Sequence, residues 1–527
     1  MKKLTIIFVG ILLIFGFESC TDWLSIPPES EVVLENYWQT ESQATSVLSS
    51  CYRGLITNEC IERMIVWGEL RSDNLVRGSA IYEDLFKIIN VDITPTNTYA
   101  NWGSFYKVIN YCNTFLYYAP GVVNKDQNYT ITKLHVNEAE AKTIRALCYF
   151  YLVRSFHEVP LVLNPSIDDT QDYNVAKSTE RQVLDQIIKD LTEAQQFAKT
   201  SYGKEAYNKG RVTQSSIAAI LADVYLWDQQ YANCVAMCNK VLEDQTLSLV
   251  DVDKLVPDVF YKGNSTESIF ELQFDKDVQV NNTVNNFYGL NGGGFGIHGE
   301  LSYPAYLGKK GTYNPFNFSA PTSSVKESVT DLRQSYFIGD ETNYANGNGY
   351  CIFKYTLSQC TLDANQTATP AYRNYSTTAN WILYRLSDVI LMKAEALVQL
   401  NRTDEDLKAA LRLVNTTYLR SNTTADSLLY NNYGSKSALE SLVLRERQRE
   451  LLFEGKRWYD LMRMVRRTND PGSILTYLSP KLTGSNMQLK KMSVMNALYM
   501  PILKTELERN TNLTQNPFYL DSNFASN

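Results

Sequence analysis

Residues 446–463 read ERQRELLFEGKRWYDLMR. Taken as one helix, this run predicts a buried side made of Leu444, Leu451, Trp458, Leu461 and Val465. Opposite charges recur three residues apart, a separation at which side chains meet on a helix surface: Arg447 with Glu450, Glu454 with Arg457, and Asp460 with Arg463. Charge runs of this kind are usually paired or solvated. We therefore expect structural ion pairs that join helices, because catalysis would require the pairs to line a cleft.

Amphipathic helical patterns continue on the N-terminal side of this run. Thr40-x-x-Gln43 and Thr179-x-x-Gln182 are capping boxes, each of which predicts the start of a helix. A clear apolar stripe runs through residues 141–155 and ends before Pro160.

Two further segments resemble each other as paired helices. Residues 220–225 are followed by a turn and a helical pattern over 231–242, and residues 390–396 are followed likewise by 405–419. Pairs of this kind, with small residues where the helices cross, resemble tetratricopeptide units of variable length. A stack of them would bury one continuous core and form a curved scaffold. A generic helical bundle is the alternative.

Residues 251–380 interrupt the helical pattern. They are rich in Gly, Asn, Thr, Tyr and Pro, with strand-like alternation only at Phe270, Leu272 and Phe274 and around 352–355. The expected fold class is therefore mainly α, a tetratricopeptide-like helical-hairpin scaffold with a loop-rich, minor-β subdomain. We expect helical parts over 40–250 and 381–527. The ligand surface is expected in the variable region 251–380, assisted by 67–102, because loops on a rigid scaffold carry binding residues.

The N-terminus has the pattern of a secretion signal. Lys2 and Lys3 precede an uncharged apolar stretch over 4–17, which is too short to span a bilayer. Ser19 directly before Cys20 resembles a relaxed bacterial lipobox. We expect a lipoprotein signal peptide over 1–19, acylation of Cys20 and a lipid-anchored tether over 20–39. An ordinary cleaved signal with a fortuitous cysteine is the alternative.

Net charge and aromatic content limit the classes of binding partner. The formal net charge is -7, which argues against nucleic acid, since a phosphate-binding surface needs a basic excess. The 35 tyrosines favour aromatic surfaces with a polar tip that can face a hydroxylated ligand.

Cysteine and histidine give no metal or cofactor signal. Apart from Cys20, most of the nine cysteines are expected to be buried small hydrophobes, although Cys51 with Cys60, or Cys351 with Cys360, could form local bridges. The three histidines, His135, His157 and His298, have no metal-collecting spacing. We expect neither a metal nor a cofactor.

The sequence contains no catalytic motif in the structural context that its chemistry requires. Residues 294–299 match G-x-G-x-x-G, but an Asn-rich loop precedes them and Tyr303-Pro304 follows, so a flexible loop is expected instead of a dinucleotide site. The sequence contains no G-x-S-x-G, G-x-x-x-x-G-K-[ST] or H-E-x-x-H. The carboxylate pair of a glycoside hydrolase can be neither found nor excluded among 57 acidic residues. No catalytic residue is assigned, and the chain is not expected to be an enzyme.

The run at 446–463 is similar to the carboxy-terminal signature of the SusD/RagB family of outer-membrane nutrient-binding lipoproteins. The similarity extends in order along nearly the whole mature chain: 38–41, 102–106, 109–113, 138–146, 159–161, 209–213, 267–270, 354–355, 385–388, 394–396, 501–502 and 515–517. Local departures are His157-Glu158, where the family usually has Gly-Asp, and Pro501-Ile502 in place of Pro-Ile-Pro.

The resemblance implies a surface-exposed lipoprotein of the outer membrane, anchored by palmitate, that caps a TonB-dependent SusC-like transporter and presents oligosaccharides to it. Binding would occur without covalent change to the cargo. Peptide cargo is the first alternative, a surface glycoside hydrolase is a less favoured one, and a purely structural lid is a third.

Candidate ligand contacts follow from aromatic residues in the two variable segments. They are Trp67, Tyr82, Tyr99, Tyr288, Phe295, Tyr303, Tyr306 and Tyr313, with Arg71, Asp73, Asn74 and Asn291 as polar partners. Trp102 and Trp458 are assigned to packing instead, because they stand in family motif positions.

Overall fold

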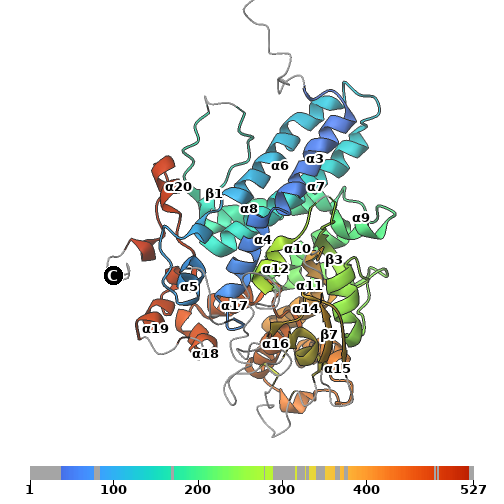
Figure 1. Cartoon of the computed structure of the whole chain (residues 1–527), viewed down its shortest axis with the longest axis vertical. Coiled ribbons are helices and arrows are strands. Elements are labelled where there is room, and N and C mark those ends of the chain that lie inside the picture. Colours follow the sequence, from blue (N-terminus) through green and yellow to red (C-terminus); the bar gives the residue numbers. More distant parts are fainter. Residues whose placement is uncertain are drawn as a thin grey trace, which may run out of the picture.

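The computed structural model describes residues 37–75, 83–167, 171–277, 279–288, 315–316, 327, 331–339, 351–362, 368–372, 378–479, 482 and 486–520. Helices dominate these residues, and the strands are short (Figure 1). Among the described helices, none is both long enough and apolar enough to cross a bilayer.

The N-terminal half is a set of packed long helices. They are α3 (Glu41–Leu55), α6 (Gly103–Val122), α7 (Ile131–Phe156), α8 (Glu180–Gln195), α10 (Gln214–Trp227) and α11 (Tyr231–Leu242). Helix α3 packs on α6, α6 on α7, α7 on α8 and α10 on α11 (Figure 1). Both predicted capping boxes form, at Thr40 and Thr179. The two caps satisfy amide groups that the first turn of each helix leaves without a partner.

The C-terminal half continues the same stack. Its long helices are α14 (Leu386–Leu400), α15 (Asp404–Ser421), α16 (Lys436–Glu450) and α17 (Arg457–Thr468). Helix α14 packs against α11 on one side and against α15 and α16 on the other, so the two predicted hairpins share one core. The tetratricopeptide-like helical scaffold is therefore confirmed.

Shorter helices connect and cover this stack. They are α4 (Asn58–Ile65) with the π-helical segment Val66–Leu70, α5 (Glu83–Ile89), α9 (Glu205–Gly210), α12 (Asn282–Tyr288), α13 (Leu332–Phe337), α18 (Leu475–Leu478), α19 (Asn486–Met492) and α20 (Lys504–Arg509).

The described strands form two-stranded antiparallel sheets, as the minor-β prediction required. The pairs are β1 (Val159–Pro160) with β2 (Lys177–Ser178), β3 (Ser268–Leu272) with β8 (Trp381–Arg385), β4 (Ile338–Gly339) with β5 (Cys351–Ile352), and β6 (Leu357–Leu362) with β7 (Ala368–Tyr372). Strand β3 lies before the boundary expected at residue 380 and pairs with β8, which lies after it. The boundaries expected at 250 and 380 stay predictions. The strand expected around Phe270 and Leu272 is present as β3, although it ends before Phe274; every residue of β3 is buried, and α9 and α10 pack against it. The strand expected over 352–355 also stops early, because β5 ends at Ile352.

The run at 446–463 is not one helix. Helix α16 ends at Glu450 and α17 begins at Arg457. Phe453 and Gly455 between them have positive φ angles of 67° and 70°, a region of backbone space that breaks a right-handed helix. A Cβ on Gly68 would lie 1.9 Å from the carbonyl oxygen of Gly455. This close approach joins the first π-helical segment to the turn between α16 and α17, and only glycine permits it.

The described cysteines are buried and free. The possible bridge between Cys51 and Cys60 is therefore wrong. Cys51 neighbours the thiol of Cys112 instead, and this contact, together with burial, raises the pKa of Cys51 well above its usual value. The side chains of Cys351 and Cys360 lie outside the described residues, so their bridge stays a prediction.

Candidate functional site

Trp67 lies in the core and not on a ligand surface. Its ring stacks on Phe105 at a centroid distance of 5.1 Å and meets Phe156 edge to face at 5.2 Å. Its indole N–H donates to the carbonyl of Tyr99 over 2.8 Å. With 1% of its surface exposed, Trp67 has no face left for a ligand, and its predicted role is corrected.

The three predicted polar partners near Trp67 are buried as well. Arg71 lies over the ring of Trp458 and donates to the carbonyls of Ala497 and Leu498, and burial lowers the pKa of Arg71 to about 10. Asp73 accepts two hydrogen bonds from Arg457, at 2.7 and 2.8 Å.

Asn74 completes this buried group. Its amide donates to Glu69 over 2.6 Å, and its oxygen accepts from Gln448 over 2.8 Å. Arg71, Asp73 and Asn74 therefore tie the N-terminal segment to the C-terminal half of the fold. Their expected exposure is wrong, because acceptors and donors for them lie more than 370 residues away in the sequence.

Tyr288 and Tyr99 differ in how far they are buried. Tyr288, at the end of α12, is fully buried and stacks on Tyr355 at 5.8 Å, so the ligand role predicted for it is also corrected. Tyr99 is only partly buried and keeps its candidacy. The remaining predicted residues lie outside the described residues and stay predictions: Cys20, Tyr82, Asn291, Phe295, Tyr303, Tyr306 and Tyr313.

Charged side chains fill the centre of the C-terminal half. We call these residues together the ion-pair network, which has two sets. The first, around Arg385, consists of Glu267, Asp331, Arg333, Lys354, Arg385, Arg420, Glu446, Glu450 and Glu454. The second consists of Asp388, Glu395, Arg447, Lys456, Asp460 and Arg463. In the first set, Arg385 binds the carboxylates of Glu267 and Glu450 at 2.6 Å and that of Glu454 at 2.7 Å. These charges are compensated by one another in a medium where unpaired charges would be costly.

The predicted pairs along 446–463 are only partly correct. Asp460 and Arg463 do pair, at 2.7 Å. Arg447 pairs with Asp388 and Asp460, both at 3.0 Å, instead of Glu450. Glu454 binds Arg385 and Lys354 instead of Arg457. The network is structural, because its members are buried and do not line an open site.

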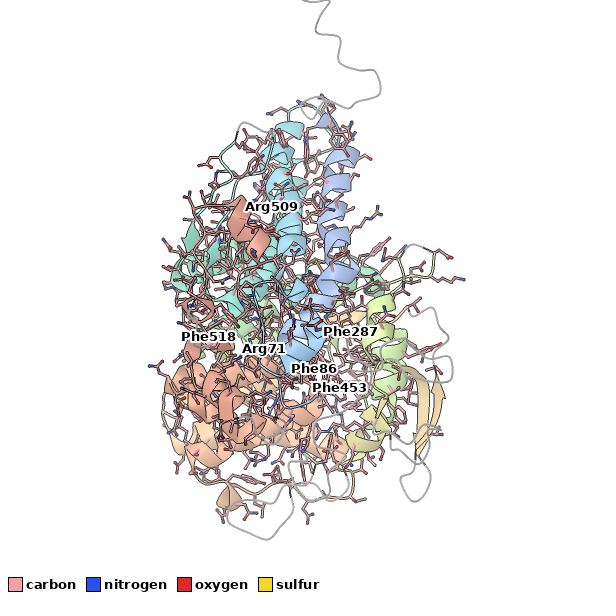
Figure 2. All side chains as sticks on the ribbon, turned by 60° about the vertical axis from the view of Figure 1, so that its left-hand side comes forward. Arg71, Phe86, Phe287, Phe453, Arg509 and Phe518 are labelled. Atoms are coloured by element: carbon pink, nitrogen blue, oxygen red, sulfur yellow. The ribbon has the colours of Figure 1, made fainter. Side chains whose placement is uncertain are left out.

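Two arginines of α16, Arg445 and Arg449, hold the described positions Pro315 and Glu327 of the variable region. Arg449 donates to the carbonyl of Pro315 over 3.0 Å, and Glu327 binds Arg445 at 2.5 Å and Arg449 at 3.2 Å. Figure 2 shows Phe86, Phe287 and Phe453 in the same part of the molecule. Helix α12 packs on α4, and α5 packs on the π-helical segment beside it. Described parts of both variable segments are thus packed against the helical scaffold.

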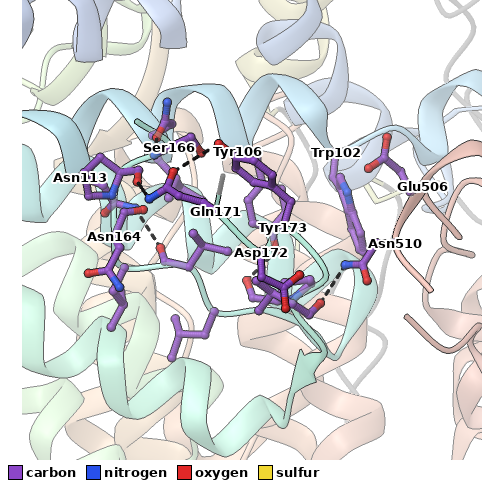
Figure 3. Close-up of a pocket in the computed structure, with 18 of the residues that line it drawn as sticks. Trp102, Tyr106, Asn113, Asn164, Ser166, Gln171, Asp172, Tyr173, Glu506 and Asn510 are labelled. Atoms are coloured by element: carbon purple, nitrogen blue, oxygen red, sulfur yellow. Dashed lines mark hydrogen bonds between the residues drawn. The ribbon is translucent and has the colours of Figure 1, made fainter. Parts of the chain in front are cut away.

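An open groove lies elsewhere, between α6, residues 160–166 and 171–175, and the end of α20 (Figure 3). We call it the α6 groove. Its volume is about 670 Å³, within the range of small-ligand sites. Trp102, Tyr106 and Tyr173 line it, and Tyr173 is 51% exposed. Trp102 is also packed against Tyr106 and Phe156, so its assignment to packing is confirmed, as is that of buried Trp458.

Hydrogen bonds fix the walls of the α6 groove. Tyr106 donates to the carbonyl of Pro160 over 2.7 Å, and Asn113 donates to the carbonyls of Val162 and Asn164. Asn510 donates to the carbonyl of Val175 over 2.8 Å (Figure 3). The wall is therefore shaped before any ligand arrives.

Charged and amide groups stand beside these rings. Asp172, Glu506 and Arg509 line the α6 groove, with Arg509 3.9 Å from Glu506. Aromatic faces next to carboxylate, guanidinium and amide groups suit a ligand that has both apolar C–H faces and hydroxyls. Sequence reasoning missed this groove because its walls come from three segments far apart in the chain.

The described part of the chain offers no metal site. No three His, Cys, Asp or Glu side chains gather there closely enough to hold a metal ion.

Two family models match this chain. A model of the SusD family matches residues 194–519, and a model described as starch-binding, associating with outer membrane, matches residues 22–226. A SusD-like protein P38 of Formosa agariphila is 25% identical, over 88% of this chain and 91% of its own length. A SusD-like protein of Bacteroides ovatus is 23% identical, over 92% and 86%.

Solved structures share the fold. A SusD superfamily protein from Bacteroides vulgatus superimposes with a TM-score of 0.72 at 20% identity, covering 91% of this chain and 99% of its own. A laminarin binding SusD-like protein superimposes with a TM-score of 0.64 at 22% identity, covering 92% and 100%.

Proposed function

The chain belongs to the SusD family, and from this premise we propose that it binds oligosaccharides at the cell surface and delivers them to a TonB-dependent SusC-like transporter. The observation that carries the binding part is the α6 groove, where aromatic faces and hydrogen-bonding groups stand on α6 and on loops that hydrogen bonds tie to the neighbouring elements. A laminarin binding protein with this fold supports the same class of cargo.

The anchoring part of the proposal rests on the sequence. Cys20 is acylated with palmitate, and the protein faces outward from the outer membrane on its tether. The description "associating with outer membrane" of the family model that matches residues 22–226 supports this location.

Binding without catalysis is the second part. SusD-like proteins are generally binding proteins that do not change their cargo. The carboxylates of the ion-pair network are neutralised by arginine and lysine in the core, so they are not placed to donate or accept a proton at a sugar. No cofactor takes part.

A matched pair of tyrosine variants tests the α6 groove. Tyr173→Ala removes an exposed ring from the groove, whereas Tyr117→Ala removes a ring on α6 that is 60% exposed and outside it. For the oligosaccharide that binds best on a glycan array, calorimetry should give at least a tenfold weaker affinity for Tyr173→Ala and an unchanged one for Tyr117→Ala. The chain should begin after Cys20.

Other results would overturn parts of this proposal. Release of reducing ends from the bound glycan would make the protein a hydrolase. A silent glycan array, with peptides recovered from a purified transporter complex, would make the cargo peptide. A third result would be a variant, with Tyr173 and the candidate loop tyrosines all replaced, that binds and imports as wild type does. That result would show that the protein is a purely structural lid.

A further inference from the structure

Lys209 is unusual among the residues of the motif at 209–213. Arg211 binds Glu140 at 2.5 Å, and Thr213 caps α10 by accepting from the amide of Ser216. Lys209 is only 4% exposed. Yet within the described chain its ammonium has neither a hydrogen-bond acceptor nor a carboxylate within 4 Å. With the rest of the side chain enclosed, the ammonium depends on the open space beside it for hydrogen-bond partners.

Lys209 lines a cavity of about 670 Å³, which we call the Lys209 cavity. The end of α8, helix α9, the start of α10 and the turn after α11 bound this space. Its apolar floor includes Ala218 and Ile269. Figure 1 shows α9 and α20 on opposite sides of the view, so this cavity is separate from the α6 groove.

Among the described residues, carboxylates lie near the ammonium of Lys209 but form no ion pair with it. Burial lowers the pKa of Lys209, while the fields of Glu205, Asp244 and Glu271 act against that change. Asp244 is already occupied as an acceptor, from Ser215 at 2.5 Å and from Thr246 at 2.6 Å. Its charge acts on Lys209 at a distance, without a direct hydrogen bond between the two side chains.

Several other polar groups in the cavity wall are occupied. Lys240 donates to Gln195 over 3.0 Å, and the Ser201 hydroxyl donates to Asn208 over 3.1 Å. Within the described chain, the groups of this wall that make no hydrogen bond to the protein include the ammonium of Lys209, the exposed carboxylates of Glu205 and Glu243, and the hydroxyl of Thr200.

An ammonium beside carboxylates favours a ligand whose groups can both accept and donate hydrogen bonds. A hydroxyl group can accept from an ammonium and donate to a carboxylate, whereas an anion can only accept. Glu205, Asp244 and Glu243 would also repel an anion. A neutral ligand with many hydroxyls satisfies both kinds of group, and the volume suits one or two sugar rings.

We propose that the Lys209 cavity is a second glycan-binding subsite, in which the Lys209 ammonium anchors one or two uncharged sugar rings by donating hydrogen bonds to their hydroxyls. This subsite rests on the proposed function in that its ligand class is the proposed cargo. It shares no lining residue with the α6 groove.

The test compares Lys209→Met with Lys204→Met. Lys204 is exposed, precedes α9 and does not line the cavity, so it is a matched control. Calorimetry would use glucose, galactose, mannose, xylose and their disaccharides, alongside glucuronate, sulfate and free amino acids. A neutral sugar should bind wild type and Lys204→Met equally, and Lys209→Met at least tenfold more weakly.

A second measurement keeps the test independent of the folding of the variant. In wild-type protein, the neutral sugar should slow acetylation of Lys209 at least fivefold without changing that of Lys204, as read by mass spectrometry of the peptides. Thermal unfolding of Lys209→Met should occur at no lower temperature than that of wild type, because an unpaired buried charge is removed.

Three outcomes would overturn the proposal. They are no binding of any neutral sugar to wild type, equal binding to wild type and Lys209→Met, and a preference for sulfate, glucuronate or an amino acid over every neutral sugar. The two proposals can fail separately. If long glycans bind through the Tyr173 groove while Lys209→Met behaves as wild type, only the subsite fails; if single sugars bind at Lys209 while the glycan array stays silent, only the delivery of oligosaccharide fails.

Discussion

The hairpin of α10 and α11 and the junction of α16 and α17 are both buried, but they are held together differently. The hairpin buries apolar side chains such as Leu221 and Val241. The junction buries charged ones, and Arg385 alone meets three carboxylates there. An apolar side chain needs only neighbours of suitable volume, whereas a buried charge needs particular partners in fixed positions.

This difference has a consequence for tolerance to mutation. The hairpin should lose stability in proportion to the volume removed from it. The junction should lose stability according to the number of charges that a substitution leaves without a partner.

The largest effect is expected at the centre of the ion-pair network. Arg385→Ala leaves the carboxylates of Glu267, Glu450 and Glu454 with fewer cations in the core, and should lower the free energy of unfolding by about 3 to 5 kcal/mol. Urea denaturation measures this. Arg412→Ala, whose pair with Glu405 is exposed, should cost less than about 1 kcal/mol. Equal losses for the two variants would show that the network does not stabilise the fold.

The apolar hairpin should respond through cavity formation. Leu221→Ala empties space in a closed core and should cost about 2 to 5 kcal/mol in urea denaturation. The exposed Leu429→Ala should change stability by less than about 0.5 kcal/mol. Because no charge is involved, added salt should leave the loss at Leu221 unchanged, and a salt-dependent loss would contradict the comparison.

A pH dependence should separate the two regions further. Burial raises the pKa of Glu69, which accepts from the amides of Phe453 and Gly455 at the junction, from 4.5 to about 7. Between these values the folded state binds the proton and the unfolded state does not. The free energy of unfolding should therefore fall by about 3 kcal/mol as pH rises from 4.5 to 7.

Glu69→Gln tests this assignment, because it cannot titrate. Urea titrations across that range should lose most of the fall in the variant, whereas the exposed Glu405→Gln should keep it. A Glu69→Gln protein with the wild-type slope would place the titrating group elsewhere.

The smallest effect is expected at a helix cap of the N-terminal half. Thr179 accepts from the amide of Gln182 at the start of α8, and Thr179→Ala should cost about 1 kcal/mol in thermal or urea unfolding. Ser49→Ala within α3, where the hydroxyl only bonds back to Thr45, should cost almost nothing. A loss at Thr179 as large as that at Arg385 would remove the distinction between local and long-range stabilisation.

Local sequence patterns were sufficient to predict the helices. The capping boxes at Thr40 and Thr179 and the apolar spacing of the hairpins predicted elements that the structure contains, because the interactions involved join residues within four positions of each other. The run at 446–463 and its companion motifs predicted the family. Its break at Phe453 and Gly455 was not predicted, because it depends on the approach of Gly68 from another part of the chain.

The sequence by itself therefore determined the helical scaffold and the family of this protein, since both are written in short-range spacing and ordered motifs. Only the tertiary structure decided which polar residues are buried and which are available. Asp73 resembles a surface residue until Arg457 is brought to it, and Lys209 resembles an ordinary charged helix residue until the folded chain leaves it in a cavity without a partner. The physical reason is that the cost of burying a charge depends on groups that folding alone brings near it.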